Sequence, residues 1–224
     1  TPMKLKSILD AGDLKGKYVI VRASLNMPLE DGVVRDDFRL MRALPTLRFL
    51  CEQGARTVLI AHIGRKSDET LKPVFNELEK YLPAHWGGVI TEKEFSERHS
   101  LMAEGDILMA ENLRQDPREV ANDSAFAHFI MNLGEVYVND AFAVSHREQA
   151  SVYALALQMP SYAGLNIRQE IKELETALHP EHPALFMLGG AKFDTKMPLI
   201  EKFLELYDNV FIGGALANDI LKAR

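Results

Sequence analysis

The chain has 224 residues, which is enough to bury a core and to form more than one domain of ordinary size. Its 26 Lys and Arg residues against 32 Asp and Glu residues give a formal charge of −6, which argues against a nucleic-acid-binding protein. A hydrophobic share of 47% excludes a disordered chain, and the single cysteine, Cys51, excludes an intrachain disulfide and a cysteine zinc site.

Apolar runs alternate with amphipathic stretches from the start of the chain to about Pro160. The apolar runs predict strands at 18–23, 57–63, 106–110 and 135–139. Helical spacing predicts helices at 40–51, at 74–82 and after an N-cap at Asn122. Pro45 should kink the first helix or delay its start, and Trp86 should lie in a connection. The alternation predicts an α/β fold, with a Rossmann-like domain of three layers in which helices cover both faces of a parallel sheet.

The pattern changes near Pro160. An exposed helix rich in Glu and Lys is expected at 169–178, and two strands that each run into a glycine pair follow at 185–188 and 210–212. We therefore expect a first domain at 1–165, an interdomain helix and linker at 166–183, and the beginning of a second α/β domain at 184–224. Two strands cannot enclose a core of their own, so we expect the chain to stop partway through this second domain.

Arginines, histidines and asparagines gather at the predicted strand ends. They are Arg22, Asn26, Arg39, His62, Arg65, Asn112, Arg114, His146 and Arg147. Parallel α/β sheets bind ligands at the carboxyl ends of their strands, and guanidinium groups hold phosphate or carboxylate with charge-assisted hydrogen bonds of about 1.5 to 3 kcal/mol each. The set predicts a site for a small, multiply charged anion such as a sugar phosphate. The alternative is that the arginines are solvated or paired with acids, and that His62 serves in the core or as a cap.

A second pattern, Gly189-Gly190-Ala191-Lys192, follows a predicted strand and opens a helix, with Lys196 on the same helix face as Lys192. Glycines at such a turn let a phosphate approach backbone N–H groups and the positive end of the helix dipole. An ordinary strand-to-helix turn with two solvated lysines is an equally good interpretation. Neither a P-loop nor a dinucleotide-binding fingerprint occurs in the chain.

Taken in order, these loops resemble the phosphoglycerate kinase family over essentially the whole chain. Residues 22–28 resemble the R-V-D-[FL]-N-V-P motif, residues 61–65 resemble S-H-L-G-R, and residues 111–114 are identical to E-N-L-R. Residues 138–142, followed by His146 and Arg147, resemble V-N-D-A-F and A-H-R. Residues 188–196 resemble L-G-G-A-K-x-x-x-K, and residues 211–215 resemble part of I-I-G-G-G-M.

The resemblance implies a glycolytic transferase: a kinase that moves a phosphoryl group between 1,3-bisphosphoglycerate and ADP, or between 3-phosphoglycerate and ATP in reverse. Residues 1–165 would bind the glycerate and residues 184–224 would begin the nucleotide-binding domain, with Mg²⁺ accompanying ATP or ADP. Closure by hinge bending would bring the substrates together and exclude water. The resemblance also implies a monomer, and the lack of an apolar run long enough to span a membrane or serve as a signal favours a cytoplasmic protein without membrane or nucleic-acid partners.

The resemblance also implies roles for individual residues. The expected substrate-binding residues are Arg22, Ser24, Asn26, Arg39, His62, Arg65, Arg114 and Arg147. The expected catalytic residues are Arg39, Lys192 and Lys196. The expected nucleotide-binding residues are Gly189, Gly190, Lys192, Lys196, Gly213 and Gly214, and Glu170 is the expected hinge residue. No metal ligand is assigned in this chain, because the family's magnesium-holding aspartate belongs to the part of the family sequence that is absent here.

Three positions depart from the family pattern, and the chain is about half the family's length. Ser24 replaces an aspartate, Lys66 replaces a proline and Gln115 replaces a phenylalanine. We expect the chain alone to bind substrate without turnover. The alternatives are a non-catalytic anion-binding module and a structural or interaction protein. The arginine set argues against the structural protein, and the retained Lys192 and Lys196 favour the kinase over the binding module.

Overall fold

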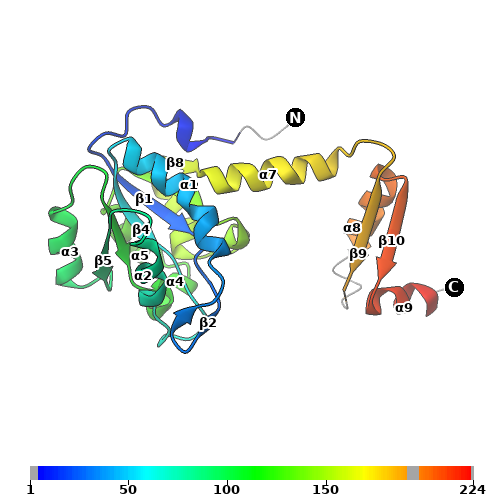
Figure 1. Cartoon of the computed structure of the whole chain (residues 1–224), viewed down its shortest axis with the longest axis horizontal. Helices are drawn as coiled ribbons and strands as arrows, with labels where there is room; N and C mark the ends of the chain where they lie inside the picture. Colours follow the sequence, from blue (N-terminus) through cyan, green and yellow to red (C-terminus); the bar gives the residue numbers. More distant parts are fainter. Residues whose placement is uncertain (1–4, 191–196, 223–224) are drawn as a thin grey trace. The chain divides into compact units, whose positions relative to one another are not determined.

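The computed structural model describes the backbone of residues 5–190 and 197–222, with the side chains of 219–221 left aside. The chain divides into two compact units, Thr1–Glu170 and Ile171–Arg224. The division falls within helix α7 (Leu165–Leu178), drawn in yellow in Figure 1, which lies in and just before the segment expected as a linker. The boundaries expected from the sequence stay predictions.

A six-stranded sheet in which all the strands are parallel forms the centre of the first unit (Figure 1). Its strands, in spatial order, are β5 (Ala84–Gly88), β6 (Ile107–Ala110), β4 (Arg56–Ile60), β1 (Tyr18–Ala23), β7 (Val136–Asp140) and β8 (Ser161–Ala163). The four loops singled out in the sequence follow β1, β4, β6 and β7, which occupy adjacent positions in the sheet in the order β6, β4, β1, β7. Because the strands are parallel, these loops leave the sheet at the same edge.

Alternate residues of the central strand face opposite sides of the sheet. In β1, Val19 and Val21 join a core with α1 (Phe38–Glu52) and α2 (Lys72–Leu78). Ile20 joins a second core, with α3 (Lys93–Ser100), α5 (Ser124–Met131) and α6 (Leu155–Gln158). A strand buried on both faces reads as an uninterrupted apolar run, and each fully buried side chain of this kind contributes roughly 1.5 to 3 kcal/mol. The predicted three-layer α/β class is confirmed.

Short elements complete the first unit. They are η1 (Ile8–Asp10), β2 (Leu29–Glu30), β3 (Val33–Val34), η2 (Leu113–Gln115), α4 (Pro117–Val120), η3 (Phe142–Val144) and the π-helical turn η4 (Ala150–Ala154). β2 and β3 form a small antiparallel pair outside the main sheet.

Some of the local predictions were wrong. Trp86 lies in strand β5 and not in a connection, because a short edge strand ending in two glycines gives little apolar periodicity. The N-cap of α5 is Asp123 and not Asn122, since the Asp123 carboxylate accepts a hydrogen bond from the backbone N–H of Phe126 at 2.7 Å. The first helix does not start late at Pro45, because α1 begins at Phe38 and continues through Pro45 to Glu52.

The second unit contains two parallel strands, β9 (Leu185–Gly189) and β10 (Asn209–Gly213), with helices α8 (Met197–Leu206) and α9 (Ala215–Lys222). One face of the pair is covered by aromatic packing, with ring centroids of Phe186 and Phe203 4.1 Å apart and Tyr207 at 5.4 Å from both. Across the described parts of both units, no helix is both long and apolar enough to cross a membrane.

Candidate anion-binding site

The cationic residues predicted at the strand ends act on one another electrostatically. Burial is the largest cause that lowers the pKa of His62, to about 2, and the charges of Arg22, Arg114, Arg147 and Arg39 lower it further. These arginines come from different segments of the chain. Because all of them influence the same ring, the fold must bring them close to His62. Cations that repel one another across a partly desolvated surface are stabilised by an anion between them, and this is the electrostatic basis of the candidate site.

A second group of charges surrounds Arg114. Burial lowers the pKa of this guanidinium, Arg147 and Arg65 lower it further, and Glu119 and Glu69 act in the opposite direction. Arg65 and Arg147 are both exposed, and within the described residues no hydrogen bond or ion pair holds either guanidinium. Both groups are therefore available to a ligand.

The turn after β4 is held by residues that the sequence singled out as ligand contacts. Asn26 accepts a hydrogen bond from the N–H of Gly64 at 2.8 Å, and Arg114 donates to the carbonyl of Gly64. Gly64 has a φ of 62°, and a Cβ at this position would overlap the Glu69 carboxylate. That carboxylate accepts from the N–H groups of Arg65 and of its neighbour, both at 2.6 Å. Asn26 and Arg114 thus shape the loop that presents Arg65.

Asn112 joins the loops that follow β4 and β6. The buried amide accepts from the N–H of Ile63 at 3.2 Å and donates to the carbonyls of Ile63 and Glu69 at 3.0 and 2.8 Å. All of these partners are backbone groups, so the amide fixes the path of the β4 loop. Asn112 therefore supports the site by stabilising this loop.

Ser24 and Arg39 lie together beside a small cavity. Nη1 of the exposed Arg39 donates to the Ser24 hydroxyl at 2.8 Å. The cavity has a volume of about 260 Å³, and Glu170 also lines it. Glu170 forms an ion pair with Arg42 at 3.2 Å, and Arg42 is an arginine that the sequence analysis did not single out. Three predicted residues from different segments therefore share one cavity.

Arg22 lies beneath the other arginines and is completely buried. It donates to the Ser151 hydroxyl at 2.9 Å and to the Ala23 carbonyl at 2.7 Å, and its Nη2 lies 2.7 Å from Nδ1 of His62. Burial is the main cause that lowers the pKa of Arg22, and the nearby Glu119 opposes this shift. The structure thus separates Arg22 from the exposed members of the predicted set.

Asp140 lies in the segment 138–142 that resembles V-N-D-A-F, and no role was predicted for it. It ends β7 and is 1% exposed, and its Oδ1 accepts from the N–H groups of Asn166 and Ile167 at 3.0 and 3.3 Å, in the first turn of α7. Burial raises the pKa of Asp140 to about 7, although the nearby Thr46 hydroxyl and these two hydrogen bonds oppose the shift. Asp140 therefore ties the start of α7 to the sheet.

The glycine pairs of the second unit lie side by side. Gly189 and Gly213 are opposite each other in the parallel pair, and the N–H of Leu216 donates to the carbonyl of Gly190 at 2.9 Å. Gly214 has a φ of 68°, which favours glycine. Lys192 and Lys196 lie outside the described residues, so their predicted place beside a phosphate is not tested.

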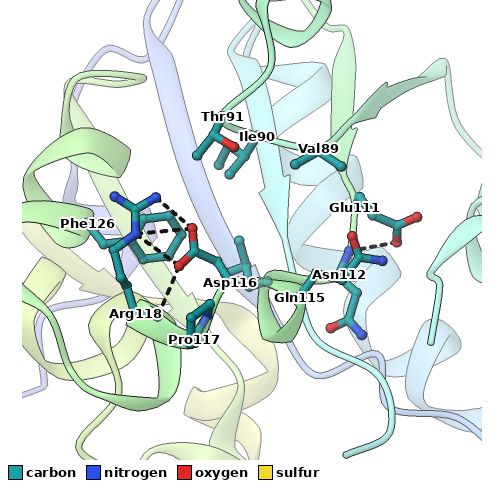
Figure 2. Close-up of a pocket in the computed structure, with 11 residues that line it drawn as sticks. Val89, Ile90, Thr91, Glu111, Asn112, Gln115, Asp116, Pro117, Arg118 and Phe126 are labelled. Atoms are coloured by element: carbon teal, nitrogen blue, oxygen red, sulfur yellow. Dashed lines mark hydrogen bonds and ion pairs between the residues drawn. The ribbon is translucent and has the colours of Figure 1, made fainter. Parts of the chain in front are cut away.

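A larger cavity of about 470 Å³ lies next to the loop after β6 (Figure 2). Figure 2 shows that its charged groups are already engaged: Arg118 pairs with Asp116 at 2.6 Å and lies over the Phe126 ring, 4.8 Å from its centroid. Glu111 accepts from the Thr70 hydroxyl at 2.6 Å and from the N–H of Asn112 at 2.7 Å. Among the described residues that line it, this cavity offers an anion no free cation. The candidate site is instead the arginine cluster, which consists of Arg39, Arg65, Arg114 and Arg147.

The described residues also bear on the expected magnesium ion. Among residues 5–190 and 197–222 there is no group of three or more His, Cys, Asp or Glu side chains that could hold a metal. Proteins often hold Mg²⁺ through one or two carboxylates together with substrate phosphates. A metal site built from side chains alone is therefore not offered by this part of the chain.

Comparison with known proteins gives a consistent result. A family model described as phosphoglycerate kinase matches residues 8–224. Proteins named phosphoglycerate kinase from Dictyoglomus turgidum and Fervidobacterium nodosum are 40% and 41% identical to 99% and 91% of the chain, which covers 58% and 53% of their lengths. The structure of phosphoglycerate kinase from Coxiella burnetii matches with a TM-score of 0.83 and 32% identity, over 98% of this chain and 56% of that one. The Pyrococcus horikoshii enzyme structure matches with a TM-score of 0.86 and 28% identity, over 98% and 58% of the two chains.

Proposed function

Because the chain belongs to the phosphoglycerate kinase family, we propose that it carries the glycerate-binding part of such a kinase together with the beginning of the nucleotide-binding part. The reaction would transfer a phosphoryl group between 1,3-bisphosphoglycerate and ADP, or between 3-phosphoglycerate and ATP in reverse. The observation that supports this most is the convergence of Arg39, Arg114 and Arg147 on His62 at the carboxyl edge of a parallel sheet. Such a site suits a small molecule that carries both a phosphate and a carboxylate.

The residues of the site divide by their exposure. We assign direct contact with the glycerate to the exposed cations Arg39, Arg65 and Arg147 and to His62, with Ser24 orienting Arg39 through its hydroxyl. We assign two roles to Asn26 and Arg114, namely contact with the glycerate and support of the loop that follows β4. A single charge-assisted hydrogen bond from such a group contributes about 1.5 to 3 kcal/mol.

The chemistry proposed for this site needs no general base. The acceptor of the phosphoryl group in the reverse direction is a carboxylate, which is already deprotonated at neutral pH. Phosphoryl transfer depends on positioning and on stabilising negative charge that spreads over the transferring group. Arg39 would supply that charge from the glycerate side, and Lys192 and Lys196 from the nucleotide side.

The remaining roles follow the family. Gly189, Gly190, Gly213 and Gly214 would approach the nucleotide phosphates, and Mg²⁺ would neutralise part of the phosphate charge when ATP or ADP binds. Glu170, held by Arg42, would lie at the hinge about which the two parts close. We expect a cytoplasmic monomer with no nucleic-acid or membrane partner.

Calorimetric titration with 3-phosphoglycerate tests the site. Arg39→Ala should weaken binding by about 1.5 to 3 kcal/mol, which is roughly 10- to 150-fold. Arg48→Ala is the matched control, because Arg48 is exposed on the same helix about 14 Å farther along its axis, and it should bind as the unaltered chain does. Binding should also weaken when the salt concentration is raised.

Equal binding by both variants, or binding that is insensitive to salt, would remove the arginine cluster from the proposal. A coupled assay addresses the chain's activity, and we expect no ATP-dependent turnover because the chain covers 58% of the length of its relative. Normal turnover would contradict this expectation. Binding without turnover, if it persisted in a full-length kinase that contains this sequence, would favour a non-catalytic anion-binding module instead.

A further inference from the structure

The contact between Arg22 and His62 fixes which atoms of the histidine ring carry hydrogen. Nη2 of Arg22 lies 2.7 Å from Nδ1 of His62, and both side chains are buried. A guanidinium group has five N–H donors and no acceptor. The ring nitrogen that faces it must therefore accept the hydrogen bond, which excludes a hydrogen on Nδ1. A neutral imidazole with no hydrogen on Nδ1 carries it on Nε2.

A buried network holds the arginine in this position. The Ser151 hydroxyl accepts from Nε of Arg22 at 2.9 Å and donates to Glu119 at 2.6 Å. The second Glu119 oxygen accepts from the N–H of Ser151 at 2.9 Å, and the Tyr137 hydroxyl donates to the Ser151 carbonyl at 2.7 Å. Glu119 is 1% exposed, so the serine links a buried anion to a buried cation. A buried charge that is compensated in this way can remain in place.

The other side of the imidazole is left open. Among the described residues, none makes a hydrogen bond to Nε2 of His62, and this atom is not one of the buried side-chain nitrogens that lack a partner. The 3% of His62 that is exposed therefore includes this nitrogen. Three members of the arginine cluster lie near the same ring, namely the exposed Arg39 and Arg147 and the half-buried Arg114, since the charges of all three lower its pKa.

We propose that Arg22 is a positioning residue that holds His62 as a neutral imidazole with its hydrogen on Nε2, so that the ring offers an anion one uncharged N–H donor. The proposal rests on the proposed function in one respect, namely that this anion is the phosphorylated glycerate. It removes Arg22 from direct contact with the ligand and gives it a task that the exposed arginines cannot perform. Ser151 and Glu119 become the supports of that task.

The consequence for pH dependence follows from the groups that face His62. Burial and the charges of Arg22, Arg114, Arg147 and Arg39 lower its pKa to about 2, far below its ordinary value. The ring therefore does not change its charge between pH 5 and 8. A donor supplied in this way has the same strength throughout that range, whereas an ordinary surface histidine would gain a positive charge and attract the anion more strongly as the pH fell.

Long-range proton–nitrogen NMR spectra of the full chain, without ligand, test the assignment. We expect the His62 signals to show hydrogen on Nε2 only and to stay unchanged from pH 5 to 8. The test variant is the charge-balanced double substitution Arg22→Met with Glu119→Gln, and Tyr137→Phe is the control because it alters the same buried network and keeps both Arg22 and Glu119. The double variant should show hydrogen on either nitrogen and a titration at higher pH than in the unaltered chain, and the control should not.

Calorimetry with 3-phosphoglycerate gives the second measurement. The double variant should bind about five- to tenfold more weakly at pH 8 than the control, which is the effect of one neutral hydrogen bond, and the difference should shrink as the pH falls and its His62 becomes charged. The ligand's own phosphate titrates equally in both proteins and the loss of the Arg22 charge does not depend on pH, so the change of the ratio with pH reports on the ring. Hydrogen on Nδ1 in the unaltered chain, or a ring that titrates there between pH 5 and 8, would overturn the proposal even if the double variant failed to fold. Failure of 3-phosphoglycerate to bind the unaltered chain would contradict the proposed function and leave the NMR result to decide this one.

Discussion

In the sheet of the first unit, β1 is buried continuously from Val19 to Ala23, whereas in the sheet of the second unit β9 alternates between exposed and half-buried residues. Both strands are apolar runs that lead into a ligand-type loop, and both have only parallel neighbours. In the described residues of the second unit, Leu185, Met187 and Phe211 are each more than half exposed. An apolar run therefore predicts a strand correctly in both units, but it does not reveal what covers each face.

The difference extends to the ionisable groups. In the first unit, burial raises the pKa of Asp140 to about 7. In the second unit, hydrogen bonds from the N–H of Ala184 and from His182 lower the pKa of the exposed Asp208. The first unit thus contains an ionisable group that is shielded from water. The described acidic, basic and histidine side chains of the second unit are exposed.

The largest effect is expected in the core of the first unit. Phe95→Ala should cost about 3 to 5 kcal/mol of the free energy of unfolding, because Phe95 is fully buried in one of the two cores. Urea unfolding followed by the fluorescence of Trp86, the only tryptophan, reports on this unit alone. Leu101→Ala is the control, since Leu101 is 82% exposed at the end of the same helix, and it should change the free energy by less than about 0.5 kcal/mol. Similar costs for both would contradict the assignment of the core.

A pH-dependent effect of intermediate size is expected at Asp140. Its raised pKa means that the folded chain binds a proton which the unfolded chain has released above about pH 4, so its contribution to stability falls as the pH rises to about 7. His62 acts in the opposite direction, since its lowered pKa costs stability as the pH falls below about 6.5. The two effects therefore oppose each other between pH 4 and 6.5 in the unaltered chain.

Asp140→Asn separates these two effects. The variant should gain stability relative to the unaltered chain as the pH rises from about 4 to 7, by at most roughly 1.4 kcal/mol per pH unit, and the difference should then stay constant. The measurement is urea unfolding at a series of pH values. Asp116→Asn serves as the comparison, and its difference from the unaltered chain should be flat from pH 5 to 8, because the pKa of Asp116 is lowered and its partner Arg118 stays charged throughout this range. A flat profile for Asp140→Asn would show that burial does not raise its pKa.

The smallest effect is expected on the uncovered face of the second unit. Met187→Gln should change the stability of this unit by less than about 0.5 kcal/mol, because Met187 is 67% exposed. Phe203→Ala, on the covered face, should cost several times more, since its ring is stacked on Phe186. Hydrogen exchange of the β9 and β10 amides measures both. A large loss for Met187→Gln would mean that something covers this face in solution.

The sequence predicted much of the candidate site because its signals were local. Each strand-end loop carries its own polar residues within a few positions, and parallel strands bring such loops together. The roles of Arg22, Ser151 and Glu119 could not be predicted in this way. Ser151 is 129 residues from Arg22 and 32 from Glu119, and a single serine outside any motif carries no signal of a buried contact. Only the fold shows that Arg22 points inward while Arg39 and Arg65 remain exposed.

The helices and strands show the same dependence on local signals in the sequence. Strands that are buried on both faces were placed to within about one residue at β1, β6 and β7, because a continuous apolar run is a strong signal. β5 and β8 lie at the two sides of the sheet, and their few buried residues give no such run. An edge strand has a neighbouring strand on one side only and needs fewer apolar residues. Prediction from sequence therefore fails at the edge strands.

The order of the strands also has a consequence for folding during synthesis on the ribosome. β1 is made early, yet its neighbours in the sheet are β4 and β7, and the last of these is not complete until residue 140. The serine that anchors Arg22 follows later still, at position 151. The cationic residues of the candidate site are therefore mostly synthesised well before the sheet that brings them together can form. Contacts of such long range are slow to form. Capture of the anion by a growing chain would thus mark the moment when the whole first unit has closed around its central strand.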